Sequence, residues 1–170
     1  MNIENVNLYL KSTLAKTVFD IDDEKIKGVE KLVRNSLEYK KVIADKRGND
    51  NENSCELFTD YDFNDKHLTL ELHHVITLYD ICNAVYKQLL TENTKDFVST
   101  LEVANKVMEY HYKNAFLYVF LSKTAHQLVH NGQYEVPLKD IKGNASLIKE
   151  TYFKYLDEPS QTIVEDILNA

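Results

Sequence analysis

Two stretches decide the fold: Leu70-Glu71-Leu72-His73-His74-Val75-Ile76 and Phe120-Leu121-Ser122-Lys123-Thr124-Ala125-His126-Gln127-Leu128-Val129-His130. Together they hold four of the six histidines of the chain. The first alternates apolar and polar residues, which predicts a strand that carries a pair of histidines. The second is an apolar run followed by histidines at i and i+4, which predicts a strand end and then a helix. We expect the two stretches to fold onto each other around one divalent metal ion.

The spacing of these histidines supports metal binding. A helix places His126 and His130 on one face, about one turn apart, and neutral imidazole is a good ligand for zinc and similar ions. His73 can supply a third ligand from the strand, in which case the three ring nitrogens should lie within about 4 Å of each other. Because adjacent strand residues point to opposite faces, His74 can face a substrate only if the strand bends at the pair.

Either motif alone is a weak signal, since a His-x-x-x-His spacing on an amphipathic helix is most often a matter of surface or packing. The combination is more specific. Glu71-Leu72-His73-His74 followed by His126-x-x-x-His130 resembles the ββα-metal motif of HNH, or His-Me finger, nucleases, and is especially similar to the colicin-type version. The flanking Ser122-Lys123 and Asn131-Gly132 also suit phage-encoded HNH-like proteins. The resemblance covers only these two pieces of the chain.

The resemblance implies a role for each histidine. His73, His126 and His130 would hold one divalent ion (Zn²⁺, Mg²⁺, Mn²⁺ or Ni²⁺), and His74 would be the general base that activates water against a DNA phosphodiester. A neutral imidazole can accept a proton near neutral pH, which suits that role. The family normally places an Asn where this chain has Leu117, so the nearest candidate to orient the base is Asn114.

Other polar residues are candidates for supporting roles. Glu71 can accept a hydrogen bond from a metal-bound histidine, and Lys123 can contact phosphate from the first turn of the metal helix. His111 can approach the site, although a packing role explains its position better. A helix expected over 24–46 is rich in lysine and arginine, which is typical of a solvated surface but also of a face that contacts DNA phosphates. The DNA-binding candidates there are Arg34, Lys40, Lys41 and Arg47.

Bulk composition narrows the class of protein. A length of 170 residues suits one domain. No apolar run reaches the length of a membrane span and no cationic apolar signal begins the chain, so we expect no membrane partner and a cytoplasmic protein, in the host cell if phage-encoded. Cys55 and Cys82 are too few and too far apart for a disulfide scaffold or a cysteine zinc site. The net charge of −7 argues against a globally cationic DNA binder but leaves room for a local basic face.

The periodicity predicts an α+β fold that is mainly helical, as one domain over 1–170. A ββα-metal core is interrupted by a two-helix insertion and flanked by N- and C-terminal helices. The divisions are 1–54 with the basic helix, 55–76 and 115–132 for the core, 77–114 for the insertion and 133–170 for the C-terminal helices. The expected helices are 3–18, 24–46, 78–90 with Thr77 as N-cap, 96–114, 122–130, 145–156 and 160–169. The expected strands are 67–76 and 115–121, with turns at 64–66 and 143–144, a possible strand over 55–63 and an extended segment over 134–138.

The leading functional hypothesis is a metal-dependent HNH-like endonuclease that cleaves DNA. The alternative is a non-catalytic protein on the same scaffold, such as a viral inhibitor or assembly factor. Its metal site would be structural or lost, and its acidic surface would bind a protein partner or a second copy. The absent Asn and the negative charge favour this alternative. A zinc hydrolase acting on another substrate has less support, because the chain lacks the Glu of a His-Glu-x-x-His motif.

Overall fold

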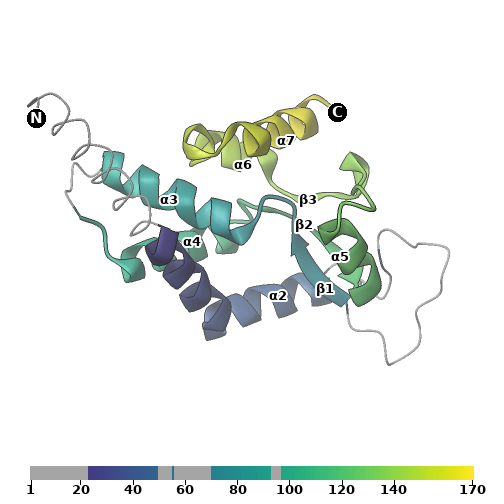
Figure 1. Cartoon of the computed structure of the whole chain (residues 1–170), viewed down its shortest axis with the longest axis horizontal. Coiled ribbons are helices and arrows are strands. Elements are labelled where there is room, and N and C mark those ends of the chain that lie inside the picture. Colours follow the sequence, from purple (N-terminus) through teal and green to yellow (C-terminus); the bar gives the residue numbers. More distant parts are fainter. Residues whose placement is uncertain (1–22, 50–54, 56–69, 93–96) are drawn as a thin grey trace, which may run out of the picture.

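The computed structural model describes residues 23–49, 55, 70–92 and 97–170, and Figure 1 shows their arrangement. The helix expected over 3–18, the turn at 64–66 and all but the first residue of the possible strand over 55–63 lie outside these residues. The described elements form a mainly helical α+β fold with one small antiparallel sheet, as predicted. Among the described helices, none is long and apolar enough to cross a membrane.

The basic segment forms two helices where the sequence predicted one over 24–46. Residues 23–35 are helical, the chain bends at Ser36, and α2 (Leu37–Asn49) follows. The Ser36 hydroxyl donates to the carbonyl of Val33 at 2.8 Å and accepts from the backbone N–H of Tyr39 at 3.1 Å. A side chain that bonds its own backbone in this way competes with the helical ladder and begins the next helix. Leu32 before the bend and Leu37 after it are both exposed.

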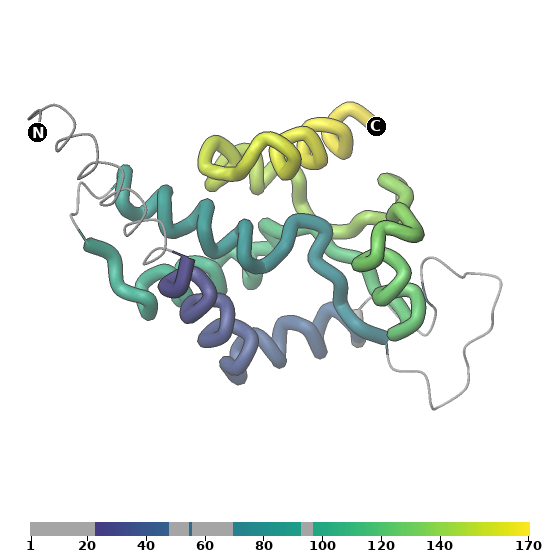
Figure 2. The backbone as a smooth tube through the Cα atoms, viewed as in Figure 1, coloured from purple at the N-terminus to yellow at the C-terminus, as the bar shows by residue number. Residues whose placement is uncertain are grey.

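The two-helix insertion is confirmed. It consists of α3 (Leu78–Glu92) and α4 (Thr100–Tyr112), which pack against each other. Thr77 caps α3 as expected, because its hydroxyl accepts from the N–H of Asp80 at 3.1 Å. The helix expected from residue 96 begins later, since Ser99 and Glu102 form a reciprocal capping box at the start of α4. Figure 2 traces how this insertion separates the two strands of the core along the chain.

The sheet has the order β1 (Leu70–His74), β2 (Leu117–Ser122) and β3 (Lys142–Gly143), with both pairs antiparallel. All six residues of β2 are buried. The chain passes directly from β2 into α5 (Lys123–His130), which packs on β1 and β2. The order β1, insertion, β2, α5 thus gives two antiparallel strands followed by a helix across them (Figure 1).

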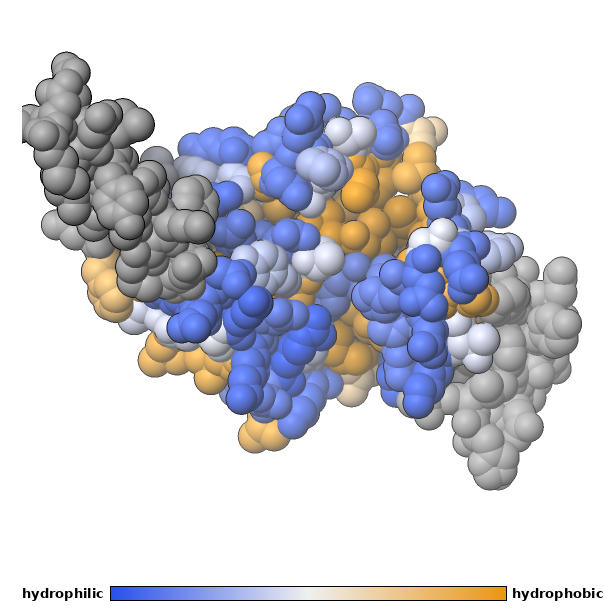
Figure 3. Space-filling view, in the orientation of Figure 1, coloured by the Kyte–Doolittle hydropathy of each residue, from blue (hydrophilic) through white to orange (hydrophobic). Residues whose placement is uncertain are grey.

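The C-terminal region packs against α3 and adds the third strand to the sheet beside β2. It contains the short 3-10 helices η1 (Leu138–Asp140) and η2 (Phe153–Tyr155) and the helices α6 (Ala145–Glu150) and α7 (Glu158–Asn169). The turn expected at 143–144 is instead the end of β3 at Gly143, followed by Asn144, whose side chain caps α6. The buried Tyr152 donates from its hydroxyl to the carbonyl of Ala115 at 2.6 Å. Polar side chains cover much of the face drawn in Figure 3, with apolar side chains visible between them.

Candidate metal centre

The helix that carries two of the candidate ligands is set by its first and last residues. Ser122 ends β2 and caps α5, since its hydroxyl accepts from the N–H of Ala125 at 3.3 Å. Ala125 is buried against the core, which fixes the rotation of the helix. Asn131 is the C-cap and Gly132 follows with a φ of 66°, a left-handed conformation that ends the helix. A helix of two turns is therefore held firmly beside β1.

His73, His126 and His130 converge between β1 and α5. Each offers one ring nitrogen, and these nitrogens all lie within 4.8 Å of one another. The Nε2 atoms of His126 and His130 are 3.0 Å apart, so this pair meets the expected spacing of about 4 Å and the full cluster is slightly wider. Binding one zinc ion at about 2.0–2.1 Å from each nitrogen would require the three rings to move slightly inward.

Glu71 fixes the orientation of His126. Its Oε2 lies 2.6 Å from the Nδ1 atom of His126, and a carboxylate can only accept, so the Nδ1–H donates. The Nε2 atom of His126 then carries the lone pair, and that nitrogen faces His130. Glu71 and His73 are two residues apart on a strand and share the face that packs on α5. This pairing of a carboxylate with a histidine ligand is the usual support of a metal-binding imidazole.

His73 is held in the neutral form that a metal requires. Partial burial first, and then the neighbouring His126 and His130, lower its pKa to about 4. Near neutral pH the ring therefore keeps a free lone pair, with no proton for an incoming ion to displace.

His74 lies on the opposite face of β1, in the protein core. The side chain is 8% exposed, its ring is stacked on Tyr39 at 6.1 Å between centroids, and it lies 5.4 Å from the ring of Phe116. Its pKa is well below 6.5, first because of burial and then because of the charges that His111 and Arg34 would place nearby. The strand stays paired through His74, opposite Tyr118, so it does not bend at the histidine pair.

The partner of His74 is His111, from the inserted helix α4. Their Nε2 atoms are 3.2 Å apart, and the Nδ1 atom of His111 is 2.8 Å from the carbonyl oxygen of Val107. His111 is fully buried, and burial lowers its pKa to about 4. The sequence favoured a packing role for His111, but no sequence signal indicated which histidine it would meet.

Asn114 occupies a turn and does not contact His74 among the described interactions. It has a φ of 62° between α4 and β2, and its side-chain oxygen accepts from the ammonium of Lys46 at 2.7 Å. Leu117, at the position where the nuclease family has its Asn, holds β1 through its backbone, since its carbonyl accepts from the N–H of Val75 at 3.0 Å. The orienting role expected for Asn114 is therefore supported by no contact in the structure.

Some of the basic candidates bond described neighbours, and others are exposed. Arg34 bonds Glu30 through Nε at 2.9 Å and Nη2 at 2.8 Å, and Arg47 donates to the carbonyl of Leu70, so α2 lies beside β1. The candidates Lys40, Lys41 and Lys123 are exposed. The basic helix thus reaches the same strand that carries the histidines.

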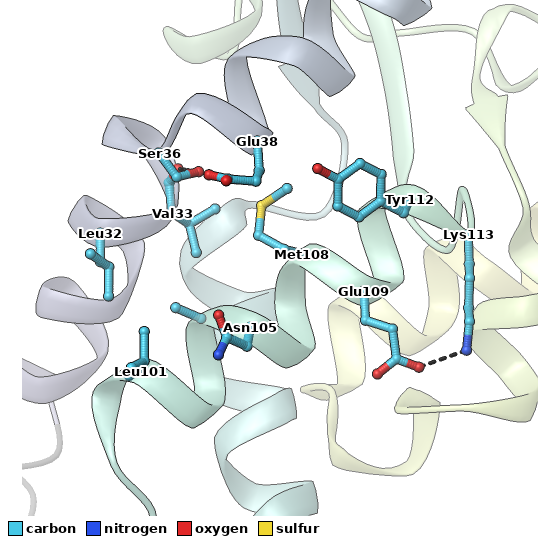
Figure 4. A pocket seen from close by; sticks show the side chains of 11 residues that line it. Leu32, Val33, Ser36, Glu38, Leu101, Asn105, Met108, Glu109, Tyr112 and Lys113 are labelled. Atoms are coloured by element: carbon cyan, nitrogen blue, oxygen red, sulfur yellow. Dashed lines mark hydrogen bonds and ion pairs between the residues drawn. The ribbon is translucent and has the colours of Figure 1, made fainter.

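A separate groove of about 590 Å³ lies between helix 23–35, the start of α2 and α4 (Figure 4). Leu32, Val33, Leu101 and Met108 give it an apolar lining, and the ion pair between Glu109 and Lys113 stands at one end. None of the four histidines of the two motifs lines this groove, so it is not part of the candidate metal centre.

A family model described as Bacteriophage G278-like virion protein matches residues 1–170. The chain belongs to this family. The match confirms the predicted link to phages, and its description names a component of the virus particle, with no mention of a nuclease. No curated protein and no solved structure matches the chain.

Proposed function

We propose that this virion-family protein is a metal-dependent, HNH-like endonuclease that hydrolyses DNA phosphodiester bonds. The observation that carries the proposal is the convergence of three histidine nitrogens within 4.8 Å, one from strand β1 and two from helix α5, which follows the antiparallel partner of β1. Three protein ligands leave at least one coordination position for water or a phosphate oxygen. Catalytic zinc sites have this arrangement, whereas structural sites usually have four protein ligands.

The chemistry of the donor set fits a divalent transition metal, because neutral imidazoles supported by a carboxylate suit zinc and related ions. When bound, such an ion supplies charge stabilisation at the phosphate and at the leaving oxygen. His73, His126 and His130 would hold it, and Glu71 would keep His126 in the ligating tautomer. Lys123, exposed in the first turn of α5, is the nearest cation along the chain to attract the DNA backbone.

The role proposed for His74 depends on its place on an edge strand. β1 is at the edge of the sheet formed by the described strands. A phosphate that lies along this edge would meet His73 from one face of the strand and His74 from the other. His74, whose pKa is lowered by burial, would take the proton of the attacking water through the 8% of its surface that is exposed. Lys40 and Lys41, exposed on α2, would extend the DNA contact.

A second candidate is a non-catalytic virion component in which a metal ion ties β1 to α5. Two observations favour it: His74 is only 8% exposed, and the family description names a virion protein. The net charge of −7 also suits a protein that binds other proteins or a second copy of itself better than one that binds DNA over much of its surface. Such a protein would act in the particle, whereas a free nuclease would act in the host cytoplasm.

Plasmid nicking separates the two candidates. Supercoiled plasmid is incubated with the purified protein and Mg²⁺, Mn²⁺, Ni²⁺ or Zn²⁺, beside His126→Ala and His74→Gln, with Gln127→Ala on α5 as the matched control. The nuclease proposal expects metal-dependent nicking that both histidine variants lose and the control keeps. Bound metal by elemental analysis without nicking in any metal would leave the non-catalytic candidate. Nicking that persists in His74→Gln would remove the general-base role.

A further inference from the structure

We infer that His111 is the positioning residue of His74: it accepts a hydrogen bond from the Nε2–H of His74 and so leaves the Nδ1 atom of His74 as the proton acceptor. The role of this arrangement in hydrolysis rests on the proposed function, but the arrangement itself can be measured without it. His111 would thereby do from the inserted helix α4 what the sequence led us to expect of Asn114.

The direction of each hydrogen bond in the series from His74 through His111 to Val107 follows from its final acceptor, the Val107 carbonyl. The carbonyl oxygen of Val107 can only accept, so the Nδ1 atom of His111, 2.8 Å away, carries the hydrogen. A neutral imidazole has one N–H, so the Nε2 atom of His111 carries the lone pair. That lone pair faces the Nε2 atom of His74 at 3.2 Å, and this nitrogen must therefore be the donor. The Nδ1 atom of His74 is left with its lone pair.

The alternatives are unfavourable in a buried site. If His74 carried its hydrogen on Nδ1, two lone pairs would face each other at 3.2 Å between buried rings. If His111 reversed its tautomer, the Val107 carbonyl would face a lone pair. If either ring were protonated, its charge would lie in the core between aromatic rings. One arrangement satisfies every donor and acceptor named here.

Aromatic packing holds the two rings in place. The ring of His111 stacks on Phe116 with 4.4 Å between centroids and an interplanar angle of 24°. Tyr39 stacks on His74 at an angle of 13° and meets His111 edge-on at 65°. Neither imidazole can rotate freely in this packing, so the hydrogen bond acts on a ring of fixed orientation. Asn114, in contrast, directs its side-chain oxygen to Lys46.

The test uses the full chain with ¹⁵N-labelled histidine and two substitutions. His111→Phe keeps an aromatic ring against Phe116 but removes the acceptor. His111→Gln offers an amide oxygen to His74 and an amide N–H to Val107. Tyr112→Phe, at an exposed neighbouring position, is the matched control. Circular dichroism establishes folding of each variant, and metal affinity is measured in parallel because a change at His73 would confuse the activity comparison.

In the wild-type protein, the ¹⁵N spectrum should show His74 protonated at Nε2 and unprotonated at Nδ1, with His111 the reverse. With metal and plasmid, the kcat of His111→Phe should fall by about 10- to 100-fold, because the variant loses part of the rate that a positioned general base contributes. Its KM and metal affinity should not change. His111→Gln should recover most of this loss, and Tyr112→Phe should match the wild type.

Several results would overturn the inference. One such result is a wild-type spectrum in which His74 is protonated at Nδ1. This measurement does not depend on the folding of any variant. A folded His111→Phe variant could nick as fast as the wild type, or His111→Gln could be as slow as His111→Phe. If no metal supports nicking by the wild type while the spectrum shows the expected tautomers, the proposed function fails and the positioning of His74 by His111 stands.

Discussion

Glu71 on β1 and His126 on α5 are joined by a hydrogen bond of 2.6 Å between Oε2 and Nδ1, although 55 positions separate them in the sequence. The bond crosses the contact between the strand and the helix. It leaves the Nε2 atom of His126 directed at the Nε2 atom of His130, 3.0 Å away. If His126 ligates a metal ion, this carboxylate would orient the ligand before binding and so lower the cost of ordering the site.

Removing this carboxylate should weaken metal binding. Glu71→Ala is expected to raise the dissociation constant for Zn²⁺ or Co²⁺ by about 10- to 100-fold, the usual effect of losing the hydrogen-bond partner of a ligating histidine. Glu71→Gln should lose less, because its amide oxygen can still accept. Chelator competition or calorimetry measures the affinity. Glu150→Ala, at an exposed position of α6, is the control. An equal loss of metal affinity in Glu150→Ala, or no loss in Glu71→Ala, would contradict the role of Glu71 as the partner of a ligating histidine.

Metal should stabilise the folded chain by mass action. At a free ion concentration about 100 times the dissociation constant, the free energy of unfolding should rise by about 2.7 kcal/mol, visible as a higher Tm that a chelator reverses. His130→Ala removes one of three ligands and should abolish most of this increase. Gln127→Ala, on the same helix, should keep it. A Tm that is the same in chelator and in excess zinc would count against a metal site at these histidines.

Acid should destabilise the metal-free protein through its buried histidines. The pKa of His111 is about 4 in the folded chain, because of burial, and 6.5 when unfolded. Between these values the unfolded chain binds a proton that the folded chain does not, so the free energy of unfolding falls as pH falls from about 6.5 to 4. The share of His111 is about 3 kcal/mol at most. His73 and His74 act in the same direction.

Urea denaturation at several pH values, in the presence of chelator, measures this effect. The free energy of unfolding of His111→Gln should depend less steeply on pH over that interval. The difference in slope should correspond to at most one fewer proton taken up on unfolding. An identical slope in the wild type and in His111→Gln would mean that His111 is already protonated or exposed in the folded state.

Gly143 should tolerate no side chain. Its φ is 116°, and a Cβ there would lie 1.8 Å from the carbonyl oxygen of Phe116, which is backbone and cannot move away cheaply. Gly143→Ala should therefore cost at least about 2 kcal/mol of stability. Gly28, exposed in helix 23–35 with nothing within 4 Å of its Cβ position, is the matched control. Gly28→Ala should stabilise by about 0.5–1 kcal/mol, and thermal unfolding of both variants tests the contrast.

Local signals predicted much of the fold. The apolar spacing and the hydroxyl caps located α3 and α5, because Thr77 and Ser122 satisfy free N–H groups whatever the rest of the chain does. The three-histidine cluster could also be predicted, since its spacing on a strand and on a helix limits where the rings can point. These helix caps and the convergence of the three histidines were thus accessible from the sequence.

Other contacts between residues far apart in the sequence were not accessible. No local pattern indicates that His111 meets His74, because α4 reaches that face only after the insertion has folded back on the sheet. The bend at Ser36 escaped prediction for another reason: a serine in a helical pattern has no preference strong enough to signal a break. The short strand β3 likewise exists only because Gly143 can approach β2 closely.

The insertion between β1 and β2 also bears on how the chain folds. These strands pair along their length, yet residues 75–116 lie between them, where a hairpin would have a short turn. α3 and α4 are neighbours in sequence and can associate early through local contacts, while pairing of β1 with β2 must close the whole intervening segment. We therefore expect the helical pair to form first, so that substitutions in α3 and α4 slow folding while those at the metal ligands mainly speed unfolding.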